Sequence, residues 1–274
     1  MRMLELARRS FLRRMIVWVL TVVAWLRRPR LAQARRRTGP NGKPRRRLGM
    51  VIDLDRCTAC GACVVACEQE NNLPTSRPAQ GEQGAQLEWM SMLWREPTDP
   101  HGLPEMLPFP CQHCEDAPCV KVCPVDATFK DEDGFVVQVT DRCIGCRYCM
   151  VACPYSRRTF NWAEPSFDGS LIQLLNPDVG TRPQGVVEKC SFCQHRYQDL
   201  KERTAVLGRT PRDEELRHLT ACASACPAEA ITFGDLEDRE GTACQLSQSP
   251  RAFRLLEDLG AKPNVVYLGR QRRG

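Results

Sequence analysis

The sequence predicts an α+β fold that contains two copies of a cysteine-rich module. The 274 residues include 17 cysteines, and sixteen of these fall into four groups of four with closely similar spacing. Two of the groups lie in matching contexts, because Asp55-Arg56-Cys57 and Val65-Ala66-Cys67 reappear as Asp141-Arg142-Cys143 and Val151-Ala152-Cys153. Short apolar segments of strand length and charged helical segments surround the groups. An internal repeat and mixed local patterns therefore favour two related modules.

The third group indicates most clearly what the cysteines bind. It reads C-x2-C-x2-C-x3-C-P from Cys143 to Pro154, which is the spacing of bacterial-type iron–sulfur runs and predicts ferredoxin-like modules. A [4Fe-4S] cube takes four thiolates, and a tight loop of this kind supplies three, so the fourth cysteine reaches a neighbouring cluster. The four groups are Cys57, Cys60, Cys63 and Cys67; Cys111, Cys114, Cys119 and Cys123; Cys143, Cys146, Cys149 and Cys153; and Cys190, Cys193, Cys222 and Cys226.

Two other uses of cysteine fit the pattern less well. Disulfide frameworks of this density belong to small secreted domains, which seldom repeat the iron–sulfur spacing. The fourth group is split by 28 residues between Cys193 and Cys222, and alone it could be a zinc site. Pro227 follows Cys226 directly, as in the iron–sulfur runs, and favours iron–sulfur ligation. Cys244 lies outside the groups, and we expect a free, partly buried thiol there.

Local patterns predict the elements that connect the groups. A hairpin across a charged turn joins the second group to the third, as in a two-cluster ferredoxin. The segment between the two halves of the fourth group is helical and charged, and could cover a partner surface. The predicted strands are 49–54, 88–94, 125–129, 135–139 and 230–233, and the predicted helices are 194–207 and 213–219.

Charge is unevenly distributed along the chain. The net charge is +6, but residues 1–47 carry +14, which leaves −8 on residues 48–274. An acidic body argues against nucleic acid as a partner, because duplex binding requires a basic surface on the folded domain. Residues 35–47 are rich in Arg, Gly and Pro without apolar periodicity, so we expect a basic flexible linker.

The N-terminus carries an export signal pattern. Residues 7–13 (ARRSFLR) resemble the twin-arginine motif, and an apolar run from Met15 to Leu26 follows. Twelve residues are too few for a helix that spans a bilayer, but they suit a signal peptide. An A-x-A site at Ala32 to Ala34 predicts a signal of residues 1–34, either cleaved or retained as an anchor. Export in the folded state suits clusters that are assembled in the cytoplasm.

The order and spacing of the groups, with Phe109 to Cys119 and Cys143 to Arg158, resemble the four-cluster electron-transfer subunits of the dimethyl sulfoxide reductase (molybdopterin oxidoreductase) family. The resemblance covers about residues 48–236. It extends to exported members such as the tetrathionate and polysulfide reductase subunits, and to the iron–sulfur domain of alternative complex III. Residues 255–263, with Tyr267 and Leu268, also resemble the C-terminus of these proteins.

The resemblance implies that ligands cross between groups, which defines four cluster sites. Two ferredoxin-like modules with two [4Fe-4S] clusters each would then be interleaved. The first module would comprise residues 48–108 and 186–236, the inserted second module residues 109–165, and a C-terminal tail residues 237–274. Site 1 would be Cys57, Cys60, Cys63 and Cys226; site 2 Cys111, Cys114, Cys119 and Cys153; site 3 Cys143, Cys146, Cys149 and Cys123; and site 4 Cys190, Cys193, Cys222 and Cys67.

The function that the resemblance implies is electron transfer without catalysis by this chain. Single electrons would pass between a polytopic quinone-binding membrane subunit and a molybdopterin catalytic subunit, in a membrane complex on the periplasmic or outer face of the cytoplasmic membrane. The alternative is the linker subunit of a membrane hydrogenase or of alternative complex III. An open-iron dehydratase needs a cluster with three cysteines, and none is evident. A redox-inactive scaffold would be recognised by clusters that cannot be reduced reversibly.

Charged residues beside the ligands are candidates for tuning the cluster potentials, and a solvated surface cation is the alternative for each of them. His113 and His195 also lie beside cysteines, but no thiolate position is vacant, so we expect hydrogen-bonding neighbours rather than ligands. The candidate cations are Arg56, Arg142, Arg147 and Lys189.

Overall fold

The computed structural model describes residues 46–74, 87–96, 105–167, 169–170 and 172–271. Arg45–Gly274 forms one compact unit. The predicted signal of residues 1–34 and the linker up to residue 45 lie outside the described residues. The last two linker residues are fixed to the folded body, since Arg46 Nη2 donates to Pro211 O at 2.8 Å and Arg47 Nε donates to Asn264 Oδ1 at 2.7 Å.

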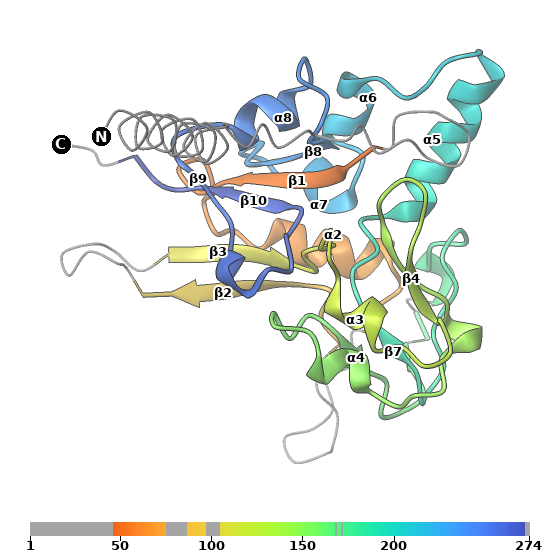
Figure 1. The fold of residues 1–274 in the computed structure, drawn as a ribbon. Helices are drawn as coiled ribbons and strands as arrows, with labels where there is room; N and C mark the ends of the chain where they lie inside the picture. Colours follow the sequence, from red (N-terminus) through yellow and green to blue (C-terminus); the bar gives the residue numbers. More distant parts are fainter. Residues whose placement is uncertain (1–45, 75–86, 97–104, 168, 171, 272–274) are drawn as a thin grey trace, which may run out of the picture. The chain divides into compact units, whose positions relative to one another are not determined.

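A four-stranded sheet joins the two ends of the described chain (Figure 1). Its strand order is β8-β1-β10-β9, with β1 parallel to β10 and antiparallel to β8. The strands are β1 (Leu48–Asp53), β8 (Ile231–Asp235), β9 (Ala252–Phe253) and β10 (Val265–Leu268). The predicted strands at 49–54 and 230–233 correspond to β1 and β8. The segment 237–274, which we expected as a tail, supplies β10, and each of its four residues is fully buried.

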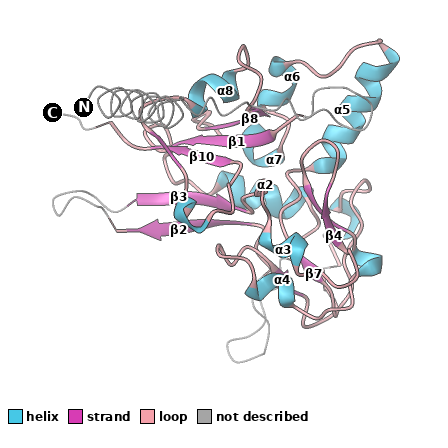
Figure 2. Ribbon diagram, in the orientation of Figure 1, coloured by secondary structure: helices cyan, strands magenta, loops and turns pink. Residues whose placement is uncertain are grey.

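The remaining strands form two-stranded ribbons (Figure 2). β2 contains most of the strand predicted at 88–94, and β4 and β5 form the hairpin predicted between the second and third groups. The ribbons pair β2 (Met90–Arg95) with β3 (Glu105–Pro110), β4 (Thr128–Lys130) with β5 (Val136–Gln138), and β6 (Thr159–Phe160) with β7 (Val187–Glu188).

Short helices follow the cysteine loops. Further helices lie in the segment between Cys193 and Cys222 and in the C-terminal segment 237–274. The predicted helices at 194–207 and 213–219 correspond to α5 and α6. The helices are α2 (Ala62–Glu70), α3 (Pro118–Lys121), α4 (Tyr148–Val151), α5 (Gln194–Val206), α6 (Asp213–Arg217), α7 (Ala221–Ser224) and α8 (Thr242–Ser247). Mixed strands and helices agree with the predicted α+β class. Within the described ranges, no helix combines the length and hydrophobicity needed to cross a membrane.

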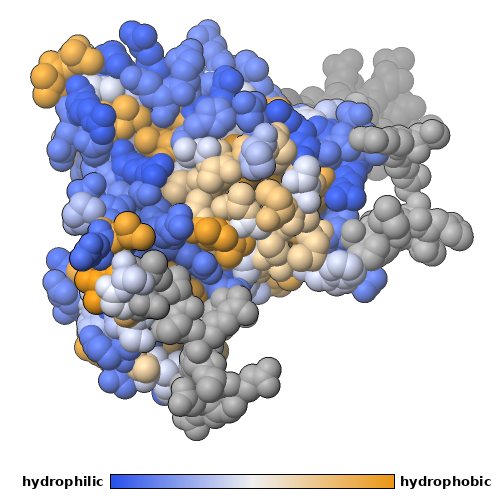
Figure 3. Space-filling model, turned by 180° about the vertical axis from the view of Figure 1, so that it is seen from behind, coloured by the Kyte–Doolittle hydropathy of each residue, from blue (hydrophilic) through white to orange (hydrophobic). Residues whose placement is uncertain are grey.

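The buried core is built partly from cysteine side chains. Cys63, Cys67, Cys111, Cys190 and Cys222 belong to the same buried cluster as the apolar residues of β1, β8 and β10. A second buried cluster contains further cysteines of the second and third groups. The face seen in Figure 3 is hydrophilic around its edges, with a broad, moderately apolar area in the middle and smaller apolar patches beside it. The interior of this chain therefore combines ordinary apolar packing with a large number of thiol groups.

Candidate functional site

The four cysteine groups share one loop conformation. In the first C-x2-C pair of each group, the residue before the second cysteine has a left-handed backbone, with φ of 56° at Ala59, 41° at His113, 69° at Gly145 and 55° at Phe192. Left-handed residues curl the backbone sharply and are uncommon outside glycine. Only Gly145 lacks a side chain, and a Cβ there would approach Gly185 O to 2.3 Å. The fourth group thus has the same local geometry as the first three.

A short helix follows each loop and carries later cysteines of the group. Cys63 and Cys67 lie on α2, one turn apart. Cys119 lies on α3, Cys149 on α4 and Cys222 on α7. In these three groups the last cysteine comes just after the helix, where the adjacent proline prevents further helical hydrogen bonding. The last cysteine of each group is therefore displaced along the helix from the loop that holds the others.

Two sets of four cysteines surround small cavities. Cys57, Cys60, Cys63 and Cys226 line one cavity together with Met92 and Ile231. The other cavity is lined by Cys123, Cys143, Cys146 and Cys149. In both sets, three cysteines come from one group and the fourth comes from another. These are the residues of sites 1 and 3.

The other two sets are packed closely enough for their thiols to interact electrostatically. Burial raises the pKa of Cys114, and Cys111, Cys119 and Cys153 raise it further. Burial likewise raises the pKa of Cys67 well above its usual value, with added contributions from Cys190, Cys222 and Cys193. These are the residues of sites 2 and 4. The structure thus brings together the cysteines that the family resemblance assigns to the same site, while their role as ligands stays a prediction.

The environment of the thiols fits a thiolate-ligated cofactor. All 17 cysteines are free, and none forms a disulfide. Burial and neighbouring thiols raise the pKa of Cys63 to about 11 and that of Cys190 to about 12, so negative sulfur here needs positive charge nearby. Backbone N–H groups also donate to sulfur, including Ala127 to Cys123 at 3.2 Å and Ala230 to Cys226 at 3.3 Å. Such N–H···S bonds stabilise ligating thiolates.

A single zinc ion at the fourth group would need ligands that converge on one point. Among the described residues, no three His, Cys, Asp or Glu side chains converge closely enough to hold one metal ion. The cysteines of sites 1 and 3 instead face a shared space, which is the arrangement that a cube with separate corners requires.

Neighbouring sites can be ordered from the electrostatic interactions between their cysteines. Cys63 of site 1 raises the pKa of Cys222 of site 4, after burial and the other thiols. Cys111 of site 2 acts on Cys190 of site 4, and Cys119 of site 2 acts on Cys149 of site 3. The order in space is therefore site 1, site 4, site 2, site 3. Site 4 is fully buried, whereas sites 1 and 3 each contain an exposed cysteine, Cys60 and Cys146 respectively.

Comparisons with known proteins agree with this geometry. A family model described as a 4Fe-4S dicluster domain matches residues 104–169, and one described as a 4Fe-4S binding domain matches residues 48–69. The iron-sulfur cluster-binding subunit of menaquinone reductase from Nitratidesulfovibrio vulgaris is 48% identical over 231 residues, which cover 81% of this chain and 89% of that protein. This chain is a member of the iron–sulfur subunits of the dimethyl sulfoxide reductase family. It is an electron-transfer subunit that binds [4Fe-4S] clusters and is not catalytic on its own.

Other similar proteins extend the family assignment. A tetrathionate reductase subunit of Salmonella typhimurium is 35% identical over 232 residues, which cover 83% of this iron–sulfur subunit and 74% of that protein. A polysulfide reductase subunit of Wolinella succinogenes is 32% identical over 235 residues, which cover 84% of the present sequence and 97% of that protein. The predicted family is confirmed by these relatives.

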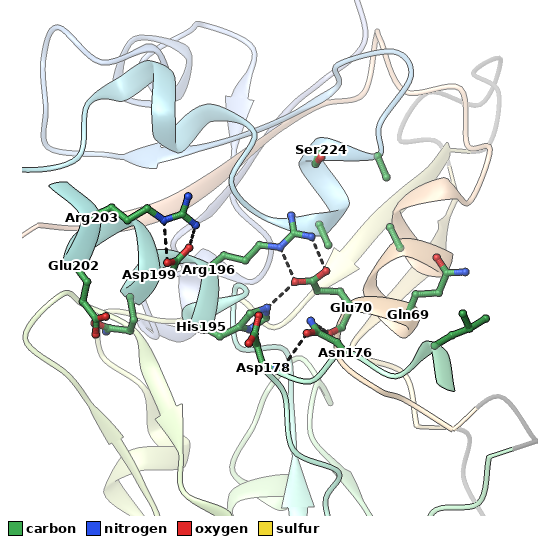
Figure 4. Close-up of a pocket in the computed structure, with 15 residues that line it drawn as sticks. Gln69, Glu70, Asn176, Asp178, His195, Arg196, Asp199, Glu202, Arg203 and Ser224 are labelled. Atoms are coloured by element: carbon green, nitrogen blue, oxygen red, sulfur yellow. Dashed lines mark hydrogen bonds and ion pairs between the residues drawn. The ribbon is translucent and has the colours of Figure 1, made fainter. Parts of the chain in front are cut away.

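A polar hollow of about 960 Å³ in the iron–sulfur subunit is lined by residues of α2, α5 and α7, the helices that carry or follow the cysteines of site 4 (Figure 4). Glu70 of α2 accepts hydrogen bonds from Arg196 on both carboxylate oxygens at 2.5 Å, and His195 Nε2 lies 2.6 Å from the same carboxylate. The pair connects the helix of Cys67 to the helix that follows Cys193. Sequence patterns did not predict this ion pair, because its members are 126 residues apart.

Residues expected beside the ligands fall into two classes in the structure. Lys189 is buried, whereas Arg56, Arg142 and Arg147 are exposed. His113 is fully buried, and its Nε2 lies 2.8 Å from Cys190 O, so it bridges the second and fourth groups as a hydrogen-bonding neighbour. Cys244 on α8 is also buried, and Gln248 Nε2 donates to its sulfur at 3.3 Å.

Proposed function

We propose that the sixteen grouped cysteines of the iron–sulfur subunit hold four [4Fe-4S] clusters at sites 1 to 4, with one ligand of each site supplied by a different group. The first module would then consist of residues 48–108 and 186–236, and the second, residues 109–165, would be inserted into it. Support comes from the convergence of the four sets of cysteines and from pairing of β1 with β8, which lie at opposite ends of the first module.

The clusters would relay single electrons in the order site 1, site 4, site 2, site 3. When bound, each cluster accepts and releases one electron. The observation that carries the proposal is the succession of sites, with the largely buried sites 4 and 2 between sites whose outermost cysteines, Cys60 and Cys146, are exposed. A relay that is protected in the middle and accessible at both ends can receive an electron at one surface and deliver it at another.

Both ends of the proposed relay carry exposed apolar side chains. Val65 lies on α2 near site 1, and its side chain is 54% exposed. Ile144 lines the site 3 cavity, Tyr148 and Val151 lie on α4 with Cys149, and these side chains are 64%, 64% and 88% exposed. Exposed apolar residues that gather around one feature are typical of protein interaction sites. We therefore place a partner subunit at each end.

The proposed partners are a molybdopterin catalytic subunit and a polytopic quinone-binding membrane subunit. Similar proteins are named as subunits of menaquinone, tetrathionate and polysulfide reductases, which supports a place between a quinone and a catalytic centre. Purification of the native complex from membranes should recover both partners with this chain. Recovery of a hydrogenase large subunit in place of the molybdopterin subunit would contradict the proposal.

The cluster content provides a direct test. Anaerobically purified protein should contain about 16 iron and about 16 sulfide per chain, as expected for four cubanes. A redox titration should show reversible reduction of the clusters. A content near eight iron, or substantial zinc, would contradict the assignment of the fourth group, and clusters that cannot be reduced reversibly would contradict the relay.

We also propose export by the twin-arginine route, with the subunit held in a membrane complex at the periplasmic or outer face of the cytoplasmic membrane. Changing Arg8 and Arg9 together to Lys should leave unprocessed or unexported protein in the cytoplasm, because the receptor reads the arginine pair. Cell fractionation and immunoblotting measure this. The matched control changes Arg27 and Arg28 to Lys, which keeps the charge and should leave export intact. Unchanged export of the first variant would overturn the proposal.

A further inference from the structure

Two cationic side chains, Arg158 and Lys189, are buried without an acidic partner among the described residues. Arg158 and Lys189 are each only 3% exposed. Within the described ranges, neither forms an ion pair with Asp or Glu, in contrast to the buried pair of Arg182 and Glu188 at 2.9 Å. A buried charge is costly unless an opposite charge compensates it. The surroundings of Arg158 and Lys189 therefore indicate which negative groups compensate their charges.

Arg158 lies between the cysteines of sites 2 and 3. Its Nη1 donates to Gln138 Oε1 at 2.8 Å, and its Nη2 donates to Thr128 Oγ1 at 2.7 Å, so neutral oxygens hold the guanidinium in place. Burial acts to lower the pKa of Arg158, but Cys119, Cys149 and Cys111 together raise it above its usual value. Thr128 and Gln138 both line the site 3 cavity, which places the guanidinium beside it, and the charge of Arg158 acts on Cys119 of site 2 and Cys149 of site 3.

Lys189 lies between the cysteines of sites 2 and 4. Its Nζ donates to Cys190 O at 2.7 Å. Burial lowers the pKa of Lys189, while Cys111, Cys190 and Cys119 act in the opposite direction. The adjacent His113 supplies no compensating charge: Val136 N–H donates to its Nδ1 at 3.2 Å, which leaves the Nε2 proton to donate to Cys190 O. The sulfur atoms are thus the negative groups that Lys189 faces.

Two buried cations, Arg158 and Lys189, consequently act on the thiols of site 2. Site 4 shares Lys189, but the other cation near its thiols, Arg196, forms an ion pair with Glu70, and both of these charges act on Cys193. Site 1 has Arg56 nearby, whose side chain is 53% exposed and paired with Glu229. Exposed charges are screened by solvent, whereas buried charges act at close to full strength.

We propose that Arg158 and Lys189 are the counter-cations of site 2, and that they make its cluster easier to reduce than the buried cluster of site 4. This inference rests on the proposed four-cluster relay. Reduction transfers one electron from a neighbouring cluster and makes or breaks no bond, and it adds one negative charge that the two cations stabilise. Positive charge and hydrogen bonds near the sulfurs raise the reduction potential of an iron–sulfur cluster. Site 2 would then hold the electron in the interior of the relay.

Potentiometric titration followed by electron paramagnetic resonance, on the purified complex, tests the proposal with Arg158→Gln and Lys189→Gln. The first variant should lower the midpoint potentials of two clusters, those of sites 2 and 3, and the second should lower those of sites 2 and 4. One cluster should respond to both substitutions, and one, at site 1, to neither. We expect at least a tenfold change in the reduction equilibrium for the shared cluster, which corresponds to about 59 mV for one electron.

Matched variants separate charge from structure. Arg158→Lys keeps the charge and should shift the midpoints less than Arg158→Gln. Lys121→Gln removes an exposed cation between Cys119 and Cys123 and should leave all four midpoints in place. Thr128→Val removes one anchor of Arg158 without removing a charge or a ligand, and it should lower the same midpoints by less. If both glutamine variants lose iron, the midpoint potentials of the Thr128→Val variant decide whether Arg158 acts on these clusters.

The outcomes distinguish this inference from the function on which it rests. Unchanged midpoints in variants that retain their iron would overturn the role of Arg158 and Lys189 and leave the relay standing. A shared responding cluster with a lower midpoint than that of site 4 in the unmodified complex would also overturn it. Fewer than four reversible clusters in the unmodified complex would instead contradict the proposed function.

Discussion

Replacing Cys67 by Ala is expected to remove the cluster of site 4 and to leave the cluster of site 1 in place. Cys67 is only four residues from Cys63 in sequence, yet its thiol interacts with Cys190, Cys193 and Cys222 of the fourth group. Cys63 faces the site 1 cavity with Cys57, Cys60 and Cys226. Loss of a fourth thiolate from a buried site leaves an iron without its ligand, so the cluster should be lost or converted to a three-iron form.

The functional effect should be far larger than the loss of one cluster among four. Site 4 lies between sites 1 and 2, so its removal interrupts the only succession of neighbouring cysteine sets in the described part of the chain. If the cluster is lost, electron transfer from a quinol analogue to the catalytic subunit should fall to background in the purified complex. Iron content should fall by about four per chain, or by about one for a three-iron form.

Two variants provide controls for this experiment. Cys63→Ala should affect site 1 and leave site 4 intact, which is the reverse of the Cys67 result. Cys244→Ala should change neither iron content nor electron transfer, because the Cys244 thiol contacts Gln248 rather than another cysteine. If Cys67→Ala removed the signal that Cys63→Ala also removes, the two cysteines would share a cluster, and the interleaved ligand assignment would be wrong.

The parts of the site that follow from local sequence could be predicted. The C-x2-C spacing determines which cysteines share a loop. In all four loops the residue before the second cysteine has the left-handed conformation. The strands at β1 and β8 and the helix α5 also follow from apolar or helical patterns within one segment. In each case the interactions that determine the structure lie within a few residues of one another, so a sequence pattern contains them.

The parts that depend on distant contacts could not be predicted. Arg158 lies five residues beyond Cys153, and no local pattern places its guanidinium against Cys119 and Cys149. Lys189 was a candidate only because it precedes Cys190, and its burial distinguishes it from the exposed Arg56, Arg142 and Arg147. Burial arises from the packing of both modules. The sequence therefore names the charges near the ligands without indicating which of them are shielded from solvent.

The C-terminal segment shows the same limit for the fold. Residues 265–268 have the composition of a buried strand, but their partner β1 is more than 200 residues away. Parallel pairing of β10 with β1 brings Leu268 O to Leu54 N at 3.0 Å, three residues before Cys57. Arg251, from the same segment, forms an ion pair with Asp53 at 2.9 Å. The segment expected to be a tail instead supports the chain that leads into site 1.

Tyr267→Ala is therefore expected to destabilise the whole subunit. Tyr267 is fully buried in β10, lies opposite Ile52 of β1, and stacks on Phe253 with ring centroids 5.7 Å apart. Its hydroxyl donates to Pro108 O at 3.0 Å, which links the main sheet to β3. Truncating a buried aromatic side chain typically costs about 3–5 kcal/mol. This is a large part of the about 5–15 kcal/mol that stabilises an ordinary domain.

Thermal unfolding of the cluster-loaded protein measures the effect, with circular dichroism and cluster absorbance recorded together. A loss of this size lowers the melting temperature by about 6–20 °C, and cluster absorbance should be lost in the same transition because β10 supports the approach to site 1. Tyr267→Phe keeps the packing and removes one hydrogen bond, which costs about 1 kcal/mol. Leu256→Ala alters a side chain that is 45% exposed and should change the free energy of unfolding by less than about 0.5 kcal/mol. If Tyr267→Ala had the same melting temperature as the Leu256→Ala control, β10 would be dispensable for stability. The subunit would then be stabilised by the segments around the cysteines alone.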